Sequence, residues 1–146
     1  MRLGKVRGGE SIALAGAALV VVSLLLPWYE GSSSGNLDAW DTFGPGVVLL
    51  LAAVAGALWM FTSALVERST AVPVRAVVWS VVLGLAAVIA AIVRALERPE
   101  HATGLCAGAW LALVGAAVIF AGAWLAVHDE RGSLYLPATP ETRPRP

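Results

Sequence analysis

Charge and cysteine are both scarce in this sequence. Of its 146 residues, 14% are charged, 58% are hydrophobic and one is a cysteine. Soluble domains carry about 25% charged residues, and a compact domain of this size cannot hide so many apolar side chains from water. A single cysteine excludes an internal disulfide framework, a thiolate metal cluster and the paired-thiol chemistry of quinone–disulfide oxidoreductases. The composition therefore indicates a chain that folds in lipid.

An excess of positive charge is also missing. Ten Lys and Arg residues balance ten Asp and Glu residues, so the formal net charge is zero. Domains that bind nucleic acid usually carry a strongly basic surface, and no nucleic-acid partner is expected here. The sequence also has no phosphate-binding loop, zinc-ligand spacing or nucleophile elbow.

Four stretches of the chain contain no charged residue: 11–29, 42–66, 76–93 and 102–127. A helix rises about 1.5 Å per residue, so about 20 residues cross a hydrocarbon core of about 30 Å. The stretches are apolar on every side, without the alternation of a membrane β-barrel. We therefore predict an all-α fold, an up-down-up-down bundle of four transmembrane helices. Its spans are expected at about residues 11–29, 44–66, 74–94 and 105–127.

The distribution of basic residues predicts the orientation. Eight of the ten lie before residue 11, in the loop 67–75 or after residue 127, whereas the other two loops hold only Arg94 and Arg98. Cytoplasmic loops are enriched in Lys and Arg, so both termini of this multi-pass plasma-membrane protein should be cytoplasmic. The expected layout is a cytoplasmic N-terminus (1–10), a transmembrane domain (11–128) and a disordered, Pro-rich cytoplasmic tail (129–146). No small-x-small cleavage site follows the first span, so we expect it to be retained.

The first outer loop is predicted to contain a short amphipathic turn. Leu37, Trp40 and Phe43 recur at intervals of three residues and would share one face, which could lie on the membrane surface or plug the outer end of the bundle. Asn36 is the expected N-cap, and Gly44 would end the turn. The acidic residues of this loop could hold a divalent ion, but a solvated loop explains them as well, and no metal site is predicted.

The predicted spans lack the groups that transport and catalysis normally use. Their interiors contain hydroxyl side chains but no charge, and an intramembrane charge is the usual mark of a proton relay or transporter. His101 and His128 would lie on opposite sides of the membrane, and Cys106 in an apolar setting is an inert thiol. No catalytic, cofactor-binding or metal-binding residue is predicted, and no cofactor.

Small residues concentrate on one face of the last predicted helix. At about 100° per residue, the face opposite them carries Cys106, Trp110 and Trp124. Helices in lipid associate through close contact of small residues, so this face should pack against another helix of the chain or a second copy. The predicted packing face comprises Gly104, Gly108, Ala112, Gly115, Gly122 and Ala126.

Several short motifs resemble those of small four-helix integral membrane proteins of actinobacteria, a group without a known activity. They are Leu-Pro-Trp-Tyr at 26–29, Leu-Asp-Ala-Trp at 37–40, Gly-Ala-Trp-Leu at 108–111 and Asp-Glu at 129–130. The resemblance covers residues 9–131 and implies the four-helix membrane fold, but no reaction.

Three hypotheses about function follow from the sequence. The first is a non-enzymatic structural or interaction protein that contacts the lipid bilayer and another membrane protein or a second copy of itself. The alternative is a small channel or carrier for an uncharged or lipidic solute. The third is a membrane enzyme that uses the outer acidic loop. A continuous polar cavity would favour transport, whereas a centre packed with Ala, Gly and Val would count against it.

Overall fold

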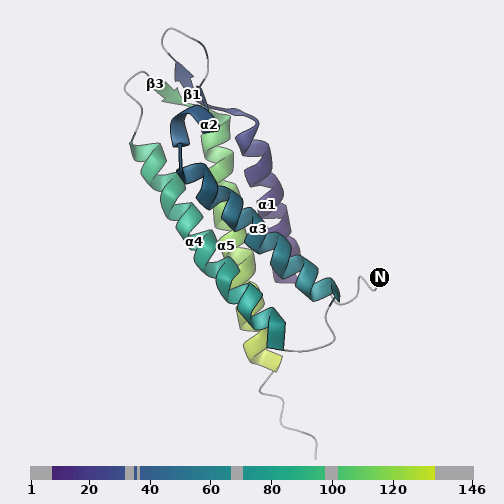
Figure 1. The fold of residues 1–146 in the computed structure, drawn as a ribbon. Helices are drawn as coiled ribbons and strands as arrows, with labels where there is room; N and C mark the ends of the chain where they lie inside the picture. Colours follow the sequence, from purple (N-terminus) through teal and green to yellow (C-terminus); the bar gives the residue numbers. More distant parts are fainter. Residues whose placement is uncertain (1–7, 32–34, 36, 67–70, 98–101, 134–146) are drawn as a thin grey trace, which may run out of the picture.

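The computed structural model describes residues 8–31, 35, 37–66, 71–97 and 102–133. Four long helices lie side by side in an elongated bundle, and a small β-sheet with a short helix covers one end (Figure 1). The long helices are α1 (Gly8–Leu24), α3 (Gly46–Val66), α4 (Ala71–Leu96) and α5 (Ala107–Ser133). The covering elements, called the sheet cap below, are β1 (Pro27–Gly31), β2 (Leu37–Asp38), α2 (Ala39–Phe43) and β3 (Ala102–Leu105).

The four long helices form a bundle in which α1 and α4 each pack against α3 and α5. α3 and α5 also contact each other, to a smaller extent. The chain alternates in direction, so α1 begins and α5 ends at the end of the bundle opposite the sheet cap (Figure 1). Among the described residues, α3, α4 and α5 contain apolar segments long enough to cross a membrane, whereas α1 is apolar but shorter, with 17 residues.

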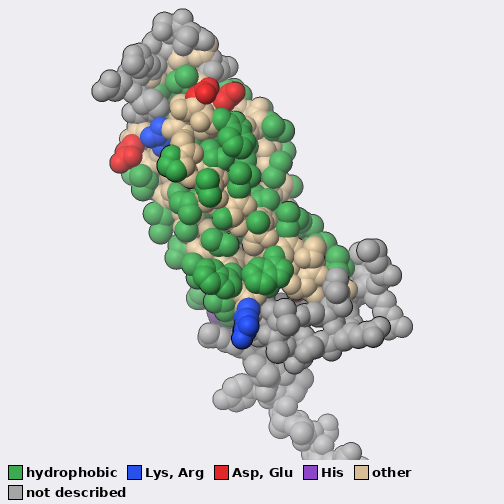
Figure 2. All heavy atoms as spheres, in the orientation of Figure 1, with side chains coloured by type: hydrophobic (Ala, Val, Ile, Leu, Met, Phe, Trp, Pro, Cys, Tyr) green, Lys and Arg blue, Asp and Glu red, His purple; other side chains and the backbone are tan. Residues whose placement is uncertain are grey.

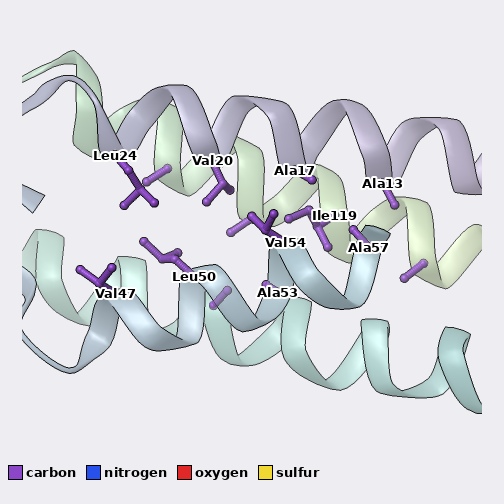
Figure 3. Close-up of a cluster of buried hydrophobic side chains, with 14 of the residues drawn as sticks. Ala13, Ala17, Val20, Leu24, Val47, Leu50, Ala53, Val54, Ala57 and Ile119 are labelled. Carbon is purple, nitrogen blue, oxygen red and sulfur yellow. The ribbon is translucent and has the colours of Figure 1, made fainter. Parts of the chain in front are cut away.

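The bundle interior is filled by small and medium-sized apolar side chains. Val20 and Leu24 of α1 point toward Leu50 and Val54 of α3, and Ile119 of α5 lies between α1 and α3 (Figure 3). Large hydrophobic side chains are instead exposed on the outer helix faces. Figure 2 shows hydrophobic side chains covering the middle of the visible face, with charged side chains toward the two ends. This distribution suits a helical bundle surrounded by an apolar solvent.

The expectation of a purely helical chain is wrong in one region, because the structure contains a three-stranded antiparallel sheet with the order β2-β1-β3. The first helix ends at Leu24 rather than at residue 29, and Pro27 opens β1. Proline has no amide hydrogen and disfavours a helical conformation in the residue before it, while the following Trp28 and Tyr29 favour extended structure. These local preferences outweigh the apolar character of the segment.

The other boundaries shift by a few residues. α4 runs from Ala71 to Leu96, beyond the predicted 74–94. α5 starts at Ala107, because β3 takes up Leu105, the first position of the predicted span, and Cys106 connects the two elements. α5 continues to Ser133, so the predicted start of the tail at residue 129 is wrong. The rest of the tail, 134–146, lies outside the described residues.

The predicted amphipathic turn is only partly present. Phe43 is buried in α2, but Trp40 is 58% exposed and Leu37 belongs to β2 rather than to the helix. The buried residues of α2 are Ala39, Thr42 and Phe43, so the helix face that packs is rotated from the predicted one. Gly44, with φ of 50°, ends the helix in a conformation that other residues rarely adopt. Asn36, the expected N-cap, lies outside the described residues, and Asp38 occupies that position.

Candidate functional site

Glycines of α1 and α5 lie at a very close approach between these two helices. A Cβ atom on Gly16 would lie 2.6 Å from the backbone nitrogen of Ile119 and 2.7 Å from the carbonyl oxygen of Gly115. A Cβ atom on Gly9 would lie 2.6 Å from the carbonyl oxygen of Gly122. Real Cβ contacts are never this short, so the two backbones touch only because these positions are glycine. We call Gly9, Gly16, Gly115 and Gly122 the glycine seam.

The seam has a regular antiparallel pattern. Gly9 meets Gly122, and Gly16 meets Gly115, so the same interval of seven residues, about two helical turns, separates the glycines on each helix. The predicted packing face of α5 includes Gly115 and Gly122, but sequence analysis named no residue of α1 as their partner. Gly9 and Gly16 have the same spacing as Gly115 and Gly122, and this match between two antiparallel helices is the sequence signal that could have identified the α1 half of this contact.

The structure distributes the predicted packing face between two environments. Ala112, Gly115, Gly122 and Ala126 are buried in the bundle, and Trp110 and Trp124 are about half exposed on the other side of α5. Gly108 is buried under β1, where an added Cβ would lie 2.6 Å from Cδ1 of Trp28. Gly104 is not on the helix: it belongs to β3 and pairs with Glu30. The prediction that Gly104 begins the helical packing face is therefore wrong.

The sheet cap is fixed to the bundle by two aromatic residues that are adjacent in β1. Trp28 and Tyr29 are both buried, although successive side chains of a regular strand point to opposite faces. The register between β1 and β2 shifts between Pro27 and Tyr29, and such an irregularity redirects a side chain. Both side chains can therefore face the helices.

Each of these aromatic residues connects different elements. The indole N–H of Trp28 donates to the carbonyl oxygen of Ser23 at 2.8 Å, and its ring meets the Phe43 ring edge-on at 5.0 Å. The hydroxyl of Tyr29 donates to the carbonyl oxygen of Arg94 at 2.7 Å. β1 thereby joins the end of α1 to α2 and to the end of α4.

Four Ser and Thr side chains are buried among the described residues, and each donates its hydroxyl hydrogen to a backbone carbonyl. The Ser23 hydroxyl bonds to Val20, Thr42 to Asp38 and Ser63 to Trp59. Ser80 bonds at 2.8 Å both to Ala76 of its own helix and to Gly56 of α3. These hydroxyls satisfy helix carbonyls, as hydroxyls in apolar helices commonly do, and do not form a row of free polar groups.

The acidic and histidine side chains of the described part lie at or near the surface and do not form a common site. Glu30, Asp38 and Asp41 are exposed on the sheet cap, and no three His, Cys, Asp or Glu side chains of the described residues could jointly hold a metal ion. His128 is exposed at the other end, with its ring 5.3 Å from that of Trp124, whereas His101 lies outside the described residues. Cys106, between β3 and α5, is a partly buried free thiol.

Comparison of the chain with protein families, curated proteins and solved structures finds no match. The chemistry of the described residues must therefore carry any inference about function.

The contact between Ser80 and Gly56 gives a first prediction. Replacing Ser80 with alanine removes the hydrogen bond between α4 and α3 and should lower the free energy of unfolding by about 0.6 kcal/mol, the average for such bonds between membrane helices. Thr62→Ala is the matched control, because the exposed Thr62 bonds only to carbonyls of its own helix. Equilibrium unfolding in mixed micelles measures the free energy of unfolding of both variants. An equal effect of the two substitutions would show that the bridge between helices adds nothing.

Proposed function

We propose that this chain is a four-span integral protein of the plasma membrane that acts without catalysis, as a structural or interaction protein. In this proposal α1 crosses the membrane together with α3, α4 and α5, both termini are cytoplasmic and the sheet cap lies on the outer side. The carrying observation is the bundle interior: it is filled by Ala, Gly, Val and a few larger apolar residues, and its buried hydroxyls are bonded to backbone carbonyls.

Exposed tryptophans support the membrane assignment. Trp40 and Trp110 lie at the sheet-cap end, and Trp59, Trp79 and Trp124 lie toward the other end; all five are about half exposed. Along α5, Trp110 and Trp124 are separated by about 21 Å at about 1.5 Å per residue. Two levels of exposed indole rings on an apolar bundle are typical of the two membrane–water interfaces.

The interior also separates the competing hypotheses. A channel or carrier for an uncharged solute needs polar groups that the solute can reach, and the buried hydroxyls described above already have acceptors within the bundle. An enzyme that uses the outer acidic loop needs its acids to converge, and Glu30, Asp38 and Asp41 do not form a metal-binding group in the described structure. Both alternatives are less well supported than a structural or interaction role.

The glycine seam limits which surface of the protein a partner could contact. Because α1 fills the small-residue face of α5, that face is not available to a second copy or to another membrane protein. A partner would have to contact the outer helix faces, where large apolar side chains are exposed, or the sheet cap.

The proposed topology is tested by cysteine labelling in intact cells. After replacement of Cys106 with serine, a cysteine at Asp41 on the sheet cap should react with a membrane-impermeant maleimide. A cysteine at Arg75, exposed at the opposite end of α4, should react only after the membrane is permeabilised. Labelling of both positions in intact cells, or of neither, would contradict the proposed arrangement.

A further inference from the structure

Arg94 occupies an unusual place in the proposed topology. It lies in the last turn of α4, next to the sheet cap, on the side of the membrane where basic residues are disfavoured. Its backbone is held in place, because its carbonyl oxygen accepts the hydrogen bond from the buried Tyr29. We therefore expect the charge of Arg94 to be neutralised by an anionic partner.

The guanidinium group of Arg94 has no partner among the described residues. Its Nε atom is buried without a hydrogen-bond acceptor, and the side chain as a whole is half-buried. Glu97 follows one turn later and is exposed, but within the described part of the chain no carboxylate forms an ion pair with Arg94. A partly desolvated cation without a counter-charge is costly, so an anion from outside the chain would stabilise it.

The depth of Arg94 indicates which anion is available. Arg75 and Arg94 begin and nearly end the apolar segment of α4, and the helix between them is about 28 Å long, close to a hydrocarbon core of about 30 Å. Ile92, Val93 and Leu96 around Arg94 are exposed apolar side chains suited to lipid chains. Lipid phosphates lie just beyond this level, and arginine binds phosphate oxygens through two parallel N–H bonds.

We propose that Arg94 binds the phosphodiester of an anionic lipid headgroup in the outer leaflet, an inference that rests on the proposed membrane topology. Because Nε is covered, the two terminal guanidinium nitrogens provide the donors. The hydrogen bond from the Tyr29 hydroxyl to the carbonyl oxygen of Arg94 fixes the end of α4. It thereby keeps the guanidinium group at the level of the phosphates.

Native mass spectrometry of the full-length protein in detergent tests this proposal with added phosphatidylglycerol. Arg94→Gln should weaken binding of one lipid molecule about tenfold, the loss expected for a charge-assisted hydrogen bond. Arg94→Lys, which keeps the charge but not the paired donors, should weaken it less. Arg75→Gln is the matched control at the other end of the same helix and should bind like the wild type.

Several results would overturn the site. One is equal lipid binding by the wild type and Arg94→Gln, and another is a loss of lipid binding in Arg75→Gln as large as that in Arg94→Gln. A third is displacement of the lipid by inorganic phosphate, which would indicate that the ligand is a free anion. If Arg94→Gln does not fold, Arg94→Lys takes its place in the test. The lipid site is then rejected if Arg94→Lys binds phosphatidylglycerol and phosphatidylcholine with the same affinities as the wild type. Carbonate extraction of the membranes from which the protein is purified separates the two proposals. If the protein stays in the membrane but Arg94→Gln does not change lipid binding, only the lipid site is refuted.

Discussion

Replacing Gly115 or Gly122 with leucine should prevent α1 from packing against α5. A Cβ atom on Gly115 would lie 2.9 Å from the backbone nitrogen of Val20, and one on Gly122 would collide with the backbone nitrogen of Ala13. Backbone atoms cannot move aside as a flexible side chain can, so the helices would have to separate. Overpacking of a core costs about 1–3 kcal/mol, occasionally more, and we expect at least the upper part of that range. Thermal unfolding in detergent, followed by circular dichroism, measures the loss.

Ala117→Leu and Ala121→Leu are the matched controls on the same helix. Both alanines are exposed on the outer face, where a larger apolar side chain meets lipid or detergent rather than backbone. They should change the unfolding temperature little, because surface substitutions away from special features usually cost less than about 0.5 kcal/mol. If Gly115→Leu and Ala117→Leu unfold alike, the close contact between α1 and α5 does not hold the bundle together.

The length and charge pattern of the sequence predict the long helices well because lipid imposes a simple requirement. A segment without charge and about 20 residues long satisfies it regardless of its neighbours. The buried face of α5 is similarly predictable from helical periodicity, which places Gly115 and Gly122 together. The partner helix is harder to predict, because the match of Gly9 and Gly16 to these positions becomes visible only when the two helices are compared with each other.

The sheet cap could not be predicted from any single segment. β1 pairs locally with β2, which has only two residues, and its other partner, β3, lies more than 70 residues further along the chain, so no local pattern marks the three-stranded sheet. Gly104 illustrates the result: helical periodicity places it on the packing face of α5, whereas its pairing with Glu30 places it in a strand. Leu37 is a similar case: its spacing predicts that it shares a helical face with Trp40 and Phe43, whereas it belongs to β2, because apolar spacing does not show where a short helix meets the sheet.

The second large effect is expected at Trp28, the residue that joins the sheet cap to the bundle. Trp28→Ala removes a side chain that is 1% exposed, its hydrogen bond to the carbonyl oxygen of Ser23 and its edge contact with Phe43. Truncation of a buried aromatic residue typically costs about 3–5 kcal/mol, which is a large part of the stability of a small domain. Unfolding in mixed micelles should show a loss in this range.

Two further substitutions show which part of the Trp28 contact matters. Trp28→Phe keeps an aromatic ring but loses the N–H donor, and should cost about 1 kcal/mol, the net value of one hydrogen bond. Trp110→Ala changes a tryptophan at the same end of the bundle that is 58% exposed, so its loss should be much smaller. If Trp28→Ala and Trp110→Ala destabilise the protein equally, the indole of Trp28 is not the anchor of the sheet cap. Trp28 contacts α5 at Gly108, outside the glycine seam, so we expect the sheet cap and the seam to be two separate sources of stability.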